Sequence, residues 1–184
     1  MEKVLNPFRY LSLRNAWCWG IVALILSTIL SWLIGLPVWC GKSIWIAAAG
    51  ITAAWLINAV IMYAVGAMVS KSKVRFTDVA AFLLFASIPK IIANLLLAIP
   101  IVNRIGVMQH AGYDTSALIE QHLPLMLKVS ILLVILLVWK VFWEYKAFSE
   151  STNVKNGKGV VCFVLICILC YIVIDILWEI FVNS

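Results

Sequence analysis

The sequence predicts an all-α integral membrane protein, a helical bundle of about five transmembrane helices. Of its 184 residues, 65% are hydrophobic and 12% are charged, whereas a soluble domain carries about 25% charged residues. Its mean hydropathy is +1.08. The apolar residues form long continuous runs instead of an alternating pattern, which favours helices over the strands of a membrane barrel.

The apolar runs also predict where each helix crosses the membrane, because a span needs about 20 apolar residues. The first run ends at Gly35 and Pro37, and the second ends before a basic loop at 70–75. The longest polar links are 103–122, with a short surface helix expected at 116–121, and 144–158. The sequence therefore predicts a single transmembrane domain over 1–184, with spans at residues 16–36, 44–69, 77–102, 123–143 and 159–182.

The positions of Lys and Arg predict the orientation, because cytoplasmic loops of membrane proteins carry an excess of both. This bias also explains the net charge of +6 without nucleic acid as a partner. We expect a cytoplasmic N-terminus and an external C-terminus, in the cytoplasmic (inner) membrane if the protein is prokaryotic. One side carries Lys3, Arg9, Arg14, Lys71, Lys73, Arg75, Lys146, Lys155 and Lys158, and the other only Lys42 and Arg104.

Lys90 is the most unusual residue, because it lies about 20 Å into the third predicted span at 1.5 Å per residue. A Lys at the centre of a span costs about 2.5–3.5 kcal/mol. Asp175 in the fifth span lies at a similar depth, and Lys128 lies in the same half of the membrane. Two interpretations are open: an intramembrane polar site or proton relay, or a structural ion pair with a Lys that reaches toward the interface.

Two further patterns predict helix shape and packing. Pro89 lacks a backbone N–H, so we expect the third helix to kink there. Small residues recur every four positions, and such faces let membrane helices approach closely. The predicted packing faces are Ala23, Ser27, Ser31 and Gly35 in the first span, and Gly50, Ala54, Asn58 and Gly66 in the second.

The sequence contains no set of residues typical of catalysis. Its five cysteines suggest neither a disulfide framework nor a zinc site. His110 and His122 are too few for a metal site, which needs three or four converging ligands. No catalytic, cofactor or metal site is expected, and the protein is not expected to be an enzyme.

Three short segments of the chain carry a resemblance to a known family: Asn6-Pro7-Phe8, Thr77-Asp78-Val79 and the stretch from Phe85 to Pro89. They resemble the Yip (Ypt-interacting protein) domain family of multi-span membrane proteins. The resemblance implies no catalytic residues. Eukaryotic members are linked to Rab-type GTPases and vesicle traffic through a longer cytosolic N-terminal region, so this short chain is more similar to the compact prokaryotic members.

We therefore expect a non-enzymatic membrane protein that acts through membrane organisation or partner binding. The expected partners are the lipid bilayer and either further copies of the chain or another membrane protein. The alternative is a small transporter or channel that uses Lys90 and Asp175 as its polar site.

Overall fold

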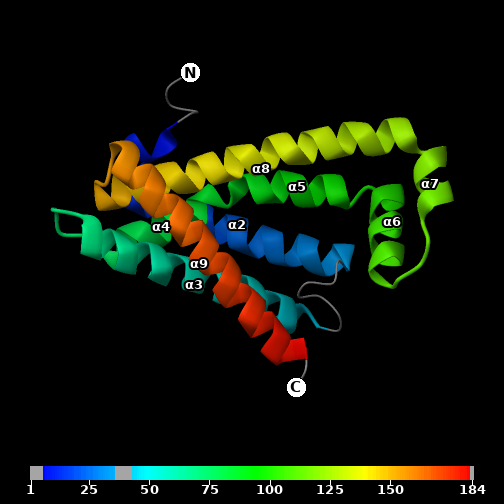
Figure 1. Ribbon diagram of the computed structural model, residues 1–184, viewed down its shortest axis with the longest axis horizontal. Helices are drawn as coiled ribbons and strands as arrows, with labels where there is room; N and C mark the ends of the chain where they lie inside the picture. The colour runs from blue at the N-terminus through cyan, green and yellow to red at the C-terminus, as the bar shows by residue number, and fades with distance from the viewer. Residues whose placement is uncertain (1–5, 36–42, 183–184) are drawn as a thin grey trace.

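The computed structural model describes residues 6–35 and 43–182, and the side chains of residues 110, 156, 175 and 177–182 lie outside this description. Within these limits every regular element is a helix (Figure 1). Five helices, one of them in two segments, are long and apolar enough to cross a membrane. The prediction of an all-α bundle is confirmed, and the chain is a multi-pass membrane protein.

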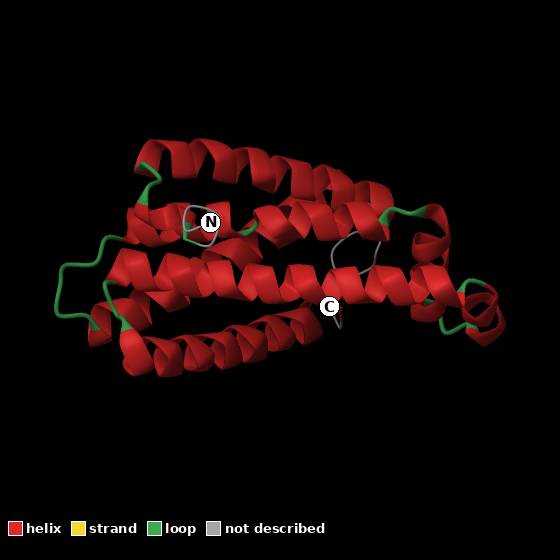
Figure 2. Cartoon of the chain, turned by 90° about the horizontal axis from the view of Figure 1, so that it is seen from above, coloured by secondary structure: helices red, strands yellow, loops and turns green. Residues whose placement is uncertain are grey.

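Most of the spans lie side by side along the long axis of the molecule, as Figure 2 shows from above. The last helix of the chain crosses them obliquely (Figure 1). The third span consists of two consecutive helices, α4 and α5. The elements are η1 Pro7–Arg9, α2 Leu13–Ile34, α3 Ile44–Val69, α4 Phe76–Ala86, α5 Ile88–Leu97, α6 Pro100–His110, α7 Ser116–Gln121, α8 Leu123–Thr152 and α9 Asn156–Val182.

Helix α4 occupies the centre of the bundle. It packs against α2, α3 and α8, while α5 continues between α2 and α8, and α9 lies against α3 and α8. Six of the eleven residues of α4 are buried, and three of these are alanines. Small side chains allow the neighbouring helices to approach α4 from several sides.

The third span differs from the predicted range of 77–102. Its helix is interrupted at Ser87, and Pro89 lies in the first turn of the second segment. A second break occurs at Ile99, whose extended backbone (φ −57°, ψ 124°) is typical of a residue before proline. Pro100 then starts α6, so residues 100–102 belong to a helix outside the span.

The fourth helix is longer than predicted. We expected the span to end at residue 143 and a polar loop to follow, but α8 continues to Thr152. Hydropathy falls after Trp143, yet no residue there breaks a helix until Asn153, which has a positive φ of 56°. Apolar character decides where a helix leaves the membrane, whereas backbone preference decides where it ends.

The small face predicted on α2 follows the helix only in part. Ala23 and Ser27 are buried, and Ser31 is half-buried and accepts a hydrogen bond of 3.3 Å from Asn94. Gly35 is exposed and ends the helix with a positive φ of 63°. Each step of four residues turns the helix about 40° beyond a full turn, so Gly35 lies about 120° around from Ala23 and does not pack.

The small face predicted on α3 lies inside the bundle. Gly50 is buried, and Ala54 and Asn58 are half-buried. Gly66 is buried against the side chain of Thr152 on α8, so closely that an added Cβ would overlap the Thr152 methyl group. These positions therefore serve contacts between helices of the same chain.

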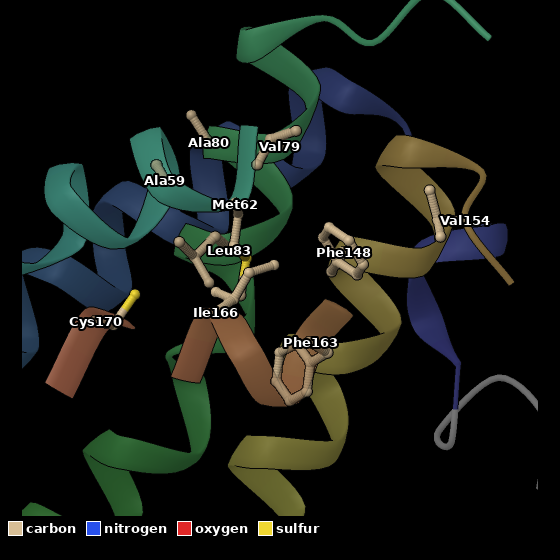
Figure 3. Packing of buried hydrophobic residues seen from close by; sticks show 10 residues of the cluster. All are labelled: Ala59, Met62, Val79, Ala80, Leu83, Phe148, Val154, Phe163, Ile166 and Cys170. Carbon is tan, nitrogen blue, oxygen red and sulfur yellow. The ribbon is translucent and has the colours of Figure 1, made fainter. Parts of the chain in front are cut away.

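One apolar core cluster joins α3, α4, α8 and α9 (Figure 3). Phe148 of α8 is fully buried, and its ring centroid lies 6.4 Å from that of Phe163 on α9. The cluster contains Ala59, Met62, Val79, Ala80, Leu83, Phe148, Val154, Phe163, Ile166 and Cys170.

A second cluster is aromatic and includes the N-terminal segment. Phe8 is only 3% exposed and lies between α4 and α8, with its ring centroid 5.5 Å from Phe82, 5.7 Å from Phe85 and 6.1 Å from Trp143. Phe85 and Trp143 stack at 5.5 Å. We call these two clusters together the packed end, because they lie toward the end of the bundle where the α3–α4 and α8–α9 loops meet (Figure 1).

Helices α6 and α7 lie across the opposite end of the bundle, at a steep angle to the spans (Figure 1). The expected surface helix at 116–121 is present as α7. The backbone N–H of Ser116 donates a hydrogen bond of 2.9 Å to Asp114 Oδ1 at its start. This bond lowers the pKa of the exposed Asp114 carboxyl.

Candidate functional site

A partly open pocket of about 180 Å³ lies between the helices, and we call it the polar cavity. Its wall combines apolar side chains with charged and hydrogen-bonding ones, and every span contributes at least one residue. α2, α3 and α8 contribute polar groups, as do α5 and the break before it, and α9 contributes Ile174. The polar lining residues are Ser27, Asn58, Ser87, Lys90, Lys140 and Glu144.

The polar cavity lies near the middle of the spans. Asn58 is 11 residues before the end of α3, Ser87 is 11 residues after the start of α4, and Lys140 is 12 residues before the end of α8. All three helix ends lie at the same end of the bundle (Figure 1). At 1.5 Å per residue these positions lie about 17 Å from that end, close to half of a hydrocarbon core about 30 Å thick.

Two lining residues form an ion pair within one helix. Lys140 Nζ lies 2.6 Å from Glu144 Oε1, one helical turn further along α8. The side chains are 30% and 12% exposed. Unpaired charges at this depth are costly, so each residue offsets the cost of the other. This hydrogen bond engages one carboxylate oxygen of Glu144, and the ammonium group of Lys140 has three N–H donors.

Ser27 adds a hydroxyl group that has no partner among the described residues. The residue is 2% exposed, its Oγ is buried, and no hydrogen bond satisfies that atom. Thr28, the next residue, bonds its hydroxyl to the carbonyl of Leu24 at 2.9 Å. A buried polar group without a hydrogen bond costs about 1–3 kcal/mol. Ser27 therefore offers an unused donor and acceptor to whatever occupies the polar cavity.

The break in the third span lies beside the polar cavity. Ser87 lines the cavity and donates its hydroxyl to the Leu84 carbonyl at 2.6 Å. Pro89 has no N–H to offer the carbonyl of Phe85, the acceptor that residue 89 would bond in a regular helix. Discontinuous membrane helices commonly line binding sites, because their unpaired backbone groups face a cavity instead of lipid.

Asn58 is hydrogen-bonded to a residue of the fifth span, Cys170. Its Oδ1 accepts a hydrogen bond from Cys170 Sγ at 3.3 Å, which leaves the amide N–H groups as donors. Cys170 is buried, whereas Cys167 is exposed on another face of α9. In the part of the chain that the structure describes, no three His, Cys, Asp or Glu side chains gather as metal ligands.

The structure places two of the three residues predicted as a polar site. Lys90 lines the polar cavity. Lys128 is exposed on α8, about 18 Å along the helix from Lys140, and does not line the cavity. Asp175 follows a lining residue, Ile174, but its side chain lies outside the described part, so its pairing with Lys90 stays a prediction.

Lys140 and Glu144 were not identified as site residues from the sequence. Lys140 lies three residues before the predicted end of the fourth span, and Glu144 is the first residue of the predicted polar link at 144–158. One available signal was their spacing, since opposite charges four residues apart meet on one helix face. Using it required the knowledge that α8 continues beyond Trp143.

Comparison of the chain with protein-family models, with curated proteins and with solved structures finds no match. The resemblance to the Yip domain family therefore stays a prediction, and the interpretation of the site depends on its own geometry.

Proposed function

We propose that this protein is a small, non-enzymatic membrane transporter that binds a polar solute in the polar cavity. The main support is that opposite charges, and a hydroxyl group with no partner among the described residues, line a cavity near the middle of the spans. Ionisable residues inside a span are costly and usually mark a solute or ion pathway. The interrupted third span adds support, because broken helices are common at transporter binding sites.

Membrane organisation through helix packing has less support from the observed contacts. The close approaches of small residues are used within the chain: Gly66 packs on Thr152, and a Cβ on Gly20 would lie 2.8 Å from Leu84 Cγ. These faces are therefore occupied and leave little small-residue surface for a partner.

The proposed orientation has a cytoplasmic N-terminus and an external C-terminus, in the cytoplasmic membrane if the protein is prokaryotic. Its support is the basic excess near the start of α2 and in the α3–α4 and α8–α9 loops, which share one end of the bundle (Figure 1). Reporter fusions at residue 184 and within the loop at 70–75 should report opposite compartments. Detection of both reporters in the same compartment would contradict this orientation.

Water access to the polar cavity tests the transport proposal. In a background with the native cysteines replaced, Ser27→Cys should react with a small charged thiol reagent in native membranes. Ile29→Cys is the matched control, because Ile29 lies on the same helix but is 40% exposed on the outer surface. We expect Ser27→Cys to react at least about tenfold faster, because the reactive thiolate forms only where water reaches the thiol.

Sided vesicles refine the same test. A transporter should allow Ser27→Cys to react with reagent added from either face, because the cavity opens alternately to both sides. Equal, slow labelling of Ser27→Cys and Ile29→Cys from both faces would show that the cavity is closed to water and would contradict the proposed function.

A further inference from the structure

The chemistry of the cavity wall identifies a class of solute. We propose that the polar cavity binds a compact zwitterion, a molecule with one ammonium and one carboxylate group close together and a small aliphatic side chain. This inference depends on the proposed function, and it goes further by naming what the site recognises.

The wall presents both signs of charge at one point. Lys140 and Glu144 are in contact at 2.6 Å, and each retains hydrogen-bonding capacity beyond that single bond. A zwitterion can lie antiparallel to this pair, with its ammonium on the second oxygen of Glu144 and its carboxylate on Lys140. Each charge then has two opposite neighbours, and the net charge of the cavity does not change.

A solute with a net charge fits this wall less well. An added cation would bring another positive charge beside Lys140 and Lys90, which both line the cavity. An added anion would compete with Glu144 for Lys140, while Lys90 already has an interaction of its own. Either would bring an extra charge into a region where uncompensated charges are expensive. The short distance within the pair also favours a solute whose own charges are close together.

The remaining lining determines size and shape. A volume of about 180 Å³ corresponds to about six water molecules at roughly 30 Å³ each. The amide N–H groups of Asn58 and the hydroxyl of Ser27 supply further hydrogen bonds, and Ser27 has no other partner among the described residues. Apolar side chains cover the rest of the wall, from Leu24, Ile51, Trp55, Leu83, Leu84 and Ile174.

A set of small probes with related carbon skeletons tests the inference on the purified protein. Binding is measured by calorimetry and by the shift in thermal unfolding with L-alanine, isobutyrate, isopropylamine and lactamide, which are zwitterionic, anionic, cationic and neutral. We expect L-alanine to bind at least about tenfold more tightly than the other three. γ-Aminobutyrate, with its charges further apart, should bind more weakly than L-alanine.

Two variants locate the binding. Ser27→Ala should weaken L-alanine binding several-fold, because one hydrogen bond is lost. Thr28→Val is the matched control, since it removes a neighbouring hydroxyl that bonds within its own helix, and it should bind as the wild type does. The double variant Lys140→Met with Glu144→Leu should lose L-alanine binding while the protein remains folded.

The outcomes separate this inference from the proposed function. If isobutyrate, isopropylamine or lactamide binds more tightly than L-alanine, and this binding depends on Ser27, the solute is not a zwitterion but the solute site is retained. If no probe binds but Ser27→Cys is still labelled by the water-soluble reagent, the zwitterion is again ruled out and the solute site is retained. The absence of binding together with an unlabelled Ser27→Cys would overturn both.

Discussion

The packed end and the polar cavity are built from the same helices but are filled in opposite ways. At the packed end, Phe148 is fully buried, and Gly66 leaves no room for one more carbon atom. One helical turn away on α8, Glu144 lines an open volume. The change from a filled interior to a hollow one thus occurs within four residues of a continuous helix. The polar cavity begins where the inward side chains of α8 change from apolar to charged. This change in side-chain chemistry distinguishes the cavity from a gap left by imperfect apolar packing.

The largest expected effect is at the packed end. Phe148→Ala should lower the free energy of unfolding by about 3–5 kcal/mol, because it removes a fully buried ring from a core cluster. Phe142→Ala is the matched control on the same helix, since Phe142 is 37% exposed, and we expect a loss below about 1 kcal/mol. Thermal or denaturant unfolding in detergent measures both, and similar losses would show that the packed end is not specially stabilising.

The next effect tests the charges of the polar cavity. Lys140→Met or Glu144→Leu alone should destabilise the protein by about 3 kcal/mol, the lower end of the range for breaking a buried pair. The double variant should be close to the wild type, because apolar side chains replace both charges together. A double variant that loses the sum of the two single effects would show that the ion pair does not form.

A smaller effect concerns the tight contact between α3 and α8. Gly66→Ala should cost about 1–3 kcal/mol, because the added Cβ meets the side chain of Thr152. Gly157→Ala is the control, since an added Cβ there meets nothing within 4 Å. That variant should be neutral or slightly stabilising. Equal stabilities of the two variants would mean that α3 and α8 can separate at little cost.

The smallest effect has the opposite sign. Ser27→Ala should leave stability unchanged or raise it by up to about 1 kcal/mol, because it removes a buried hydroxyl that has no hydrogen-bond partner among the described residues. The expected result is a constant or higher melting temperature together with weaker solute binding. A clear loss of stability would show that Ser27 supports the fold and would weaken its assignment to the site.

The spans could be predicted from sequence because a span requires high hydropathy averaged over about 20 residues. Single residues change that average very little. The charged part of the site could be predicted only through Lys90, which lies well inside an apolar run. Glu144 lies where the apolar run ends, so its position inside the bundle depends on how far α8 extends and on which helices surround it. Whether the Ser27 hydroxyl finds a hydrogen-bond partner also depends on tertiary structure. Thr28 carries the same kind of hydroxyl and hydrogen-bonds it within its own helix.

The length of α8 has a mechanical consequence. Its 30 residues rise about 45 Å, whereas the 22 residues of the α4–α5 span rise about 33 Å. A hydrocarbon core about 30 Å thick takes about 20 helical residues, so α8 tilts more or projects further beyond it than the α4–α5 span does. α8 also carries the cavity's ion pair, so acyl-chain length acts on the position of Lys140 and Glu144 relative to the other spans. Lipid thickness is therefore a variable that sets the shape of the cavity, and solute affinity should differ between vesicles of short-chain and long-chain lipids.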